Sequence, residues 1–99
     1  MLWRQGDVLI AQIDAIPAEA HRRADTVLAE GEITGHMHRI AEPDAAELFE
    51  HDGLQYLKVI ASTATLVHDE HDPITLARGL YRFWRQREYT PGAYRTIYD

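Results

Sequence analysis

The sequence contains no cysteine. Disulfide bonds, thiolate zinc sites and thiol nucleophiles are therefore excluded. No apolar run approaches the about 20 residues that a membrane-spanning helix needs. The first residues also lack the basic and apolar segments of a secretory signal. We therefore expect a cytoplasmic protein that does not enter a membrane.

Basic residues are fewer than acidic ones. The chain has 10 lysines and arginines against 16 aspartates and glutamates, and its formal net charge is −6 with neutral histidines. This balance argues against a DNA-coating role, because such proteins carry an excess of cations to contact phosphates. The six glycines form no phosphate-binding loop, and no serine-nucleophile motif occurs. The sequence leaves open whether the protein is an enzyme.

What the sequence does contain is a β pattern. Its 99 residues, 45% of them hydrophobic, fit one domain over residues 1–99. Runs rich in β-branched and aromatic residues alternate with turn signals about every 8–12 residues, which is typical of small barrels and sandwiches. We expect strands over residues 7–13, 26–40 with an interruption at Gly31, 47–50, 54–60, 63–68, 74–76, 80–89 and 94–98. Residues 17–24 fit either a short helix or a solvated loop. The prediction is an all-β fold, a small barrel or sandwich of seven or eight short strands.

Four of the six histidines lie in two close pairs, His36 with His38 and His68 with His71. Residues i and i+2 of a strand point to the same face about 6.6 Å apart, so two imidazoles there can converge on one ion. Neutral imidazole is a good ligand for zinc and other divalent transition metals. We therefore predict a metal site on these four histidines or on three of them. Three protein ligands would leave a position open for catalysis, whereas four would make a closed structural site.

Carboxylates lie close to both histidine pairs. Glu42 and Glu70 are the candidates to complete the metal site or to orient the imidazoles. The alternation from residue 32 to residue 40 places His36 and His38 on one face and puts the apolar residues, including Ile40, on or near the other. Two other interpretations stay open: the histidines act as general acid and base without a metal, or they are incidental surface residues.

Two resemblances follow from these motifs. Gly35-His36-Met37-His38, followed by three residues and Glu42, resembles the first cupin motif. That resemblance implies a small jelly-roll barrel that holds a divalent metal on two histidines and a glutamate, although the second cupin motif is missing. The combined segments 4–9, 31–38, 67–74 and 85–91 resemble a family of small uncharacterised bacterial proteins. This second resemblance implies no established activity.

The segment from residue 80 to residue 89 interleaves aromatic residues with arginine. Arg85 and Arg87 share a face, as an anion clamp requires, and Tyr89 follows them. Such a strand can hold an RNA or protein partner in a non-catalytic binding module. Packing of the aromatic residues in a core, with arginine at the rim, is the simpler interpretation.

Two further predictions involve the same residues. A metal-independent phosphodiesterase-type enzyme could combine the histidines with Arg85 and Arg87 on phosphate. Because small β-domains often associate through edge strands, we also expect a homodimer.

Overall fold

The computed structural model describes residues 1–31 and 35–86, and within these residues the chain forms eight β-strands. The strands are β1 (Leu2–Gln5), β2 (Val8–Ile13), β3 (His21–Arg22), β4 (Val27–Glu30), β5 (Met37–Ile40), β6 (Ala46–His51), β7 (Leu54–His68) and β8 (His71–Arg85). The all-β prediction is confirmed. No helix long and apolar enough to cross a bilayer occurs in the described part of the chain.

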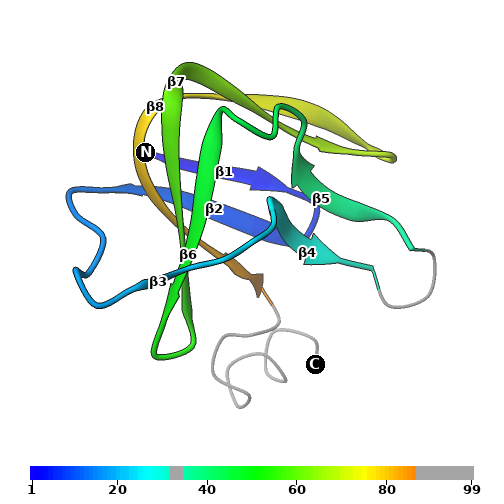
Figure 1. The fold of residues 1–99 in the computed structure, drawn as a ribbon. Helices are drawn as coiled ribbons and strands as arrows, with labels where there is room; N and C mark the ends of the chain where they lie inside the picture. Colours follow the sequence, from blue (N-terminus) through cyan, green and yellow to red (C-terminus); the bar gives the residue numbers. More distant parts are fainter. Residues whose placement is uncertain (32–34, 87–99) are drawn as a thin grey trace.

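All pairings in the sheet are antiparallel, and its main path runs β1-β2-β8-β7-β5-β4. β7 and β8 are each 15 residues long. β6 pairs with the first half of β7 and β5 with its end, and the β7–β8 register shifts between Val59 and Thr63. Figure 1 shows β7 and β8 curving together over the other strands. This curvature turns the sheet into a half-barrel.

The core lies on the concave side of this curled sheet. Alternate residues of the long strands point inward, as the period-2 geometry of a strand requires. Ile10, Leu48, Leu57, Leu66 and Leu76 are fully buried. Each such side chain contributes about 1.5–3 kcal/mol of transfer free energy relative to an exposed one. Burial of these residues holds together the strand ends that carry the histidines.

The structure differs from the expected strands in several details. The strands expected over 54–60 and 63–68 form the single strand β7, and those expected over 74–76 and 80–89 form β8 as far as residue 85. The break indicated after residue 60 is a register shift in the β7–β8 pairing, and the strand continues through it. β1 was not predicted, although it forms a tight hairpin with β2. Residues 17–24 contain no helix; they hold a turn and then β3. The expected strand over 94–98 lies outside the described residues.

The hairpin predicted at Asp52-Gly53 is confirmed. Its two turn residues have φ angles of 51° and 78°, the left-handed conformation that a type I′ turn requires. The β1–β2 hairpin is equally tight and places Gly6 at φ 59°. The second turn matters more for function, because it lies against the histidines.

Candidate functional site: a histidine cluster

The structure brings all four predicted histidines together. The ring of His68 is at the centre, with its centroid 5.8 Å from that of His36, 4.2 Å from that of His38 and 4.6 Å from that of His71. The centroids of His38 and His71 are 5.9 Å apart. Strand register explains the meeting: Arg39 of β5 pairs with Val67 of β7, so His38 lies beside His68, and His68 pairs with His71 across the β7–β8 turn.

The cluster extends from the interior to the surface. His38 is only 5% exposed, His36 and His68 are half-buried, and His71 is exposed. The expected division of faces was wrong at Ile40, which is buried on the same inward face as His38. Residues two apart on a strand must share a face, so His38 occupies a core position. Solvent therefore reaches the buried ring only past its more exposed neighbours.

A buried glutamine determines which nitrogen of His38 carries the proton. Gln5 is 2% exposed, and its amide nitrogen donates to the carbonyl oxygens of Leu66 at 3.0 Å and Asp72 at 2.9 Å. Its amide oxygen lies 2.9 Å from His38 Nδ1. Because the amide nitrogen is bound to two carbonyls, the amide oxygen faces His38, and since an amide oxygen only accepts, His38 Nδ1 donates. In the neutral ring the lone pair is then on Nε2.

His38 is held in this neutral form. Burial, together with the charge of His68, lowers the pKa of His38 to about 4, although the carboxylate of Asp7 opposes the shift. The imidazole is therefore uncharged near neutral pH, which is the form that binds metals and accepts protons.

The carboxylate of Asp7 faces this ring. Its Oδ1 atom lies 3.6 Å from His38 Nε2, while Arg85 donates to Oδ2 from Nε at 3.2 Å and from a terminal nitrogen at 3.1 Å. Partial burial raises the pKa of Asp7, but the hydrogen bond and charge of Arg85 outweigh this effect and the net pKa is lowered. Asp7 is thus a fixed carboxylate beside the buried histidine.

The β1–β2 turn approaches the imidazoles very closely. A Cβ atom added to Gly6 would lie 2.7 Å from His71 Nε2 and 3.3 Å from His38 Cε1. Sequence reasoning missed the contribution of Gln5, Gly6 and Asp7 to the site. The only signal was that this segment belongs to the motif set shared with the uncharacterised family.

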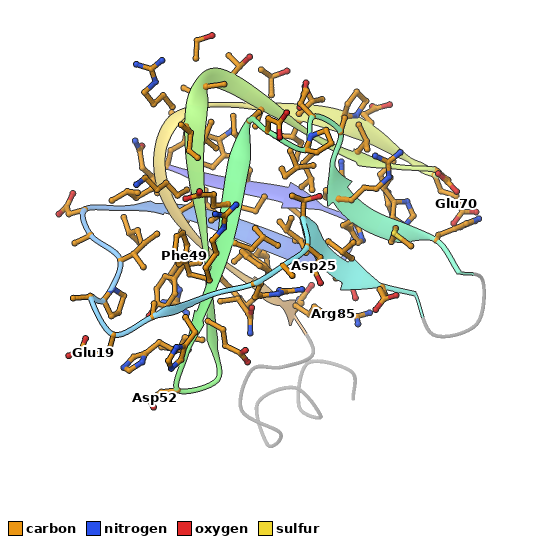
Figure 2. The ribbon with its side chains drawn as sticks, viewed as in Figure 1. Glu19, Asp25, Phe49, Asp52, Glu70 and Arg85 are labelled. Carbon is orange, nitrogen blue, oxygen red and sulfur yellow. The ribbon has the colours of Figure 1, made fainter. Side chains whose placement is uncertain are left out.

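The two predicted glutamates differ in their surroundings. Glu70 lies 3.3 Å from His36 Nδ1, and Asp69 lies 3.6 Å from His36 Nε2. Figure 2 places Glu70 at the outer tip of the β7–β8 turn, next to the start of β5. Glu42 instead accepts hydrogen bonds from the backbone and hydroxyl of Thr65 at 2.9 and 2.8 Å, and these bonds lower its pKa. Both of its carboxylate oxygens are therefore already bound.

The donor atoms do not form a ready-made metal site. Across residues 1–31 and 35–86, no group of three or more histidine, aspartate or glutamate side chains is arranged to hold an ion. One obstacle is visible at His68, whose Nδ1 accepts a hydrogen bond from the backbone N–H of Glu70 at 3.0 Å. In the neutral ring this bond leaves the proton on Nε2. Coordination through His68 Nε2 would require that hydrogen bond to break.

Most aromatic and arginine side chains described at the end of β8 pack in the core or contact other residues of the chain. Tyr81 and Phe83 are 1% and 3% exposed, so their rings cannot stack on bases. Arg82 lies 4.6 Å over the ring of Trp84. Arg85 borders a hollow of about 330 Å³ between β4, β8 and the β6–β7 hairpin, in addition to holding Asp7.

The rest of the predicted anion site is only partly visible. Gln86 donates its backbone N–H to the carbonyl of Asp7 at 2.8 Å, so the end of β8 does reach the turn beside the histidines. Arg87 and Tyr89 lie outside the described residues.

Comparison with known proteins supports the expected relationship. The chain matches none of the curated proteins and none of the solved structures with which it was compared. Residues 4–86 match the model of a family described as a domain of unknown function, DUF8820. This range includes the β1–β2 turn, all four clustered histidines and Arg85. The protein therefore belongs to the uncharacterised DUF8820 family.

Proposed function

We propose that this protein binds a divalent transition metal at the histidine cluster, with His38 as the buried anchor. The observation that carries the proposal is the hydrogen bond from His38 Nδ1 to Gln5. Metal-binding histidines commonly donate their second ring N–H to a fixed acceptor, which orients the ring and fixes the tautomer. Here a fully buried amide has that role, and it leaves the Nε2 lone pair directed at Asp7.

The spacing of the rings is compatible with shared coordination. With metal–nitrogen bonds of about 2.0–2.1 Å, the centroids of two tetrahedral imidazole ligands lie about 5 Å apart. The observed centroid distances of 4.2 to 5.9 Å bracket this value. Binding would therefore need rotations of the rings and release of the Glu70 hydrogen bond, but no change in strand register.

The surroundings of the cluster favour a cation. Asp69, Glu70 and Asp72 lie in or beside the β7–β8 turn and are exposed, and the first two contact His36 at 3.6 and 3.3 Å. Their negative charge raises the local concentration of cations and disfavours anions. The nitrogen donors favour zinc, nickel or copper over magnesium or calcium, which prefer oxygen ligands. We propose zinc as the first metal to test.

The test uses protein purified without a histidine tag. Zinc binding is measured by competition with a chromophoric chelator for the wild type and for His38→Ala, His68→Ala and His51→Ala. His51 is a matched control, because it lies at the end of β6 and its Nε2 is paired with Asp52 at 3.4 Å. We expect loss of binding in the two cluster variants and wild-type affinity in His51→Ala. Equal affinity in all four proteins would refute the proposal.

A second function is favoured by the tautomers themselves. With neutral rings, His38 presents a lone pair on Nε2 and His68 presents a proton on Nε2, and their centroids are 4.2 Å apart. A base and an acid side by side are the parts of a metal-independent proton-transfer site. Chelator-resistant activity on a substrate, lost in both variants, would favour this function over metal binding. The expected homodimer, the cytoplasmic location and an RNA or protein partner stay predictions.

A further inference from the structure

We propose that Asp7 supplies the carboxylate ligand of the metal site and that Arg85 is its positioning residue. This inference rests on the proposed metal binding, and it identifies a ligand that neither the histidine pattern nor the cupin-like motif indicates. The sequence pointed instead to Glu42 and Glu70. The contacts of the β1–β2 turn support this assignment.

Two hydrogen-bond acceptors face each other, one on His38 and one on Asp7. His38 Nε2 carries a lone pair, because Gln5 fixes the proton on Nδ1, and Asp7 Oδ1 carries negative charge. Their separation of 3.6 Å is too long for a direct hydrogen bond. Two acceptors at this distance repel each other unless a proton or a cation lies between them.

The distance between these two atoms fits a shared zinc ion. A zinc ion binds histidine nitrogen at about 2.0–2.1 Å and carboxylate oxygen at about 2.0–2.2 Å. An ion at about 2.1 Å from both His38 Nε2 and Asp7 Oδ1, 3.6 Å apart, would form a nitrogen–metal–oxygen angle of about 120°. This angle is close to tetrahedral and far from the right angle of octahedral neighbours. The two atoms therefore already have the spacing of adjacent zinc ligands.

The orientation of the Asp7 carboxylate is fixed by Arg85. Arg85 places two donors on Oδ2 and also donates to the carbonyl of Glu30 at 3.2 Å. One oxygen of Asp7 is thus held, and the other is directed at His38. Glu42 has both oxygens on Thr65, and the side chain of Glu70 is 67% exposed. Among these three carboxylates, Asp7 combines a fixed position with an oxygen facing the buried ring.

The test measures cobalt(II) and zinc binding to the chain of residues 1–99. Asp7→Asn keeps the shape of the side chain but removes its charge, and we expect it to weaken affinity by at least about tenfold. We also expect it to change the visible spectrum of bound cobalt, because a charged carboxylate ligand is replaced by a neutral amide. Glu42→Gln is the matched control, and we expect it to keep the wild-type affinity and spectrum.

The role of Arg85 is tested by coupling. If Arg85 acts through Asp7, the change in affinity caused by Arg85→Gln disappears when Asp7 is already asparagine. An equal change in both backgrounds would overturn the positioning role. Should Asp7→Asn fail to fold, Asp7→Glu retains the partner of Arg85 and moves the ligand oxygen. An unchanged cobalt spectrum in that variant would then overturn the inference.

The outcomes separate this inference from the function on which it rests. A wild-type protein that binds neither metal refutes metal binding itself. Tight binding by the wild type, together with equal binding and an equal spectrum in Asp7→Asn, refutes only the assignment of Asp7. Loss of binding in Glu42→Gln but not in Asp7→Asn would overturn it in favour of the carboxylate that the cupin-like motif indicates.

Discussion

Replacing Gly6 with alanine tests the packing of the β1–β2 turn against the histidines. The chain offers a control of the same kind in Gly53, which also lies in a tight hairpin turn. The two glycines have φ angles of 59° and 78°, so alanine pays the left-handed backbone penalty of about 1–2 kcal/mol at either position. They differ in what the new methyl group would contact.

At Gly53 no atom lies within 4 Å of the added Cβ. At Gly6 the same atom would lie 2.7 Å from His71 Nε2 and 3.3 Å from His38 Cε1. The His71 ring is exposed and can rotate away, but the buried His38 ring has little space. Overpacking of a core by one methyl group costs about 1–3 kcal/mol. We therefore expect Gly6→Ala to lose about 2–5 kcal/mol and Gly53→Ala only the backbone penalty of about 1–2 kcal/mol.

The assay is urea unfolding of both variants and the wild type in the presence of a chelator, followed by zinc titration. Each kcal/mol corresponds to about 4–8 °C in melting temperature for a domain of this size, so thermal scans give a second measurement. We expect zinc affinity to fall in Gly6→Ala, because His71 is displaced, and to stay unchanged in Gly53→Ala. Equal losses of stability and equal zinc affinities in the two variants would show that the turn does not press on the rings.

Two further predictions concern the buried pair of Gln5 and His38. Gln5→Leu should cost about 2–4 kcal/mol in urea unfolding, because it leaves two carbonyls and one imidazole N–H without their partner. Gln12→Leu, at an exposed position near the end of β2, should change stability by less than about 0.5 kcal/mol. The pKa of His38 is lowered from 6.5 to about 4, so the unfolded chain binds the extra proton first as pH falls. The metal-free protein should therefore lose about 2 kcal/mol between about pH 7.5 and about pH 5, with the loss complete below about pH 4. His38→Gln should lack this component, and an identical pH dependence in variant and wild type would contradict the assignment.

Local patterns in the sequence were sufficient to predict the fold class. Alternating apolar residues indicated the strands, and Asp52-Gly53 indicated its hairpin, because each signal depends on neighbours only a few residues away. The length of β7 was not predictable in the same way. The β7–β8 pairing shifts register between Val59 and Thr63, yet both strands continue. A few neighbouring residues of the sequence do not determine how two strands pair across a sheet.

In the candidate site, too, residues in short sequence patterns were identifiable, and residues brought in by long-range strand pairing were not. The four histidines were identifiable as pairs, and their convergence follows from a register that pairs Arg39 with Val67. Gln5 and Asp7 were not identifiable, because they reach the cluster only after β1 and β2 have folded back beside β8. The pairing of Arg85 with Asp7 was not predictable for the same reason, because the two residues are far apart in the sequence and meet only through the fold.

The polar interior at this end of the sheet is itself an argument for function. Beside the fully buried Leu66, the chain buries an imidazole and an amide that need three hydrogen bonds to be tolerated. Apolar residues of similar size would close the same space without the loss of stability in acid that a lowered histidine pKa brings. Departures of this kind from the rules of core packing are concentrated at functional sites. The buried pair of Gln5 and His38 is therefore better explained by a task for the Nε2 lone pair than by the requirements of the fold.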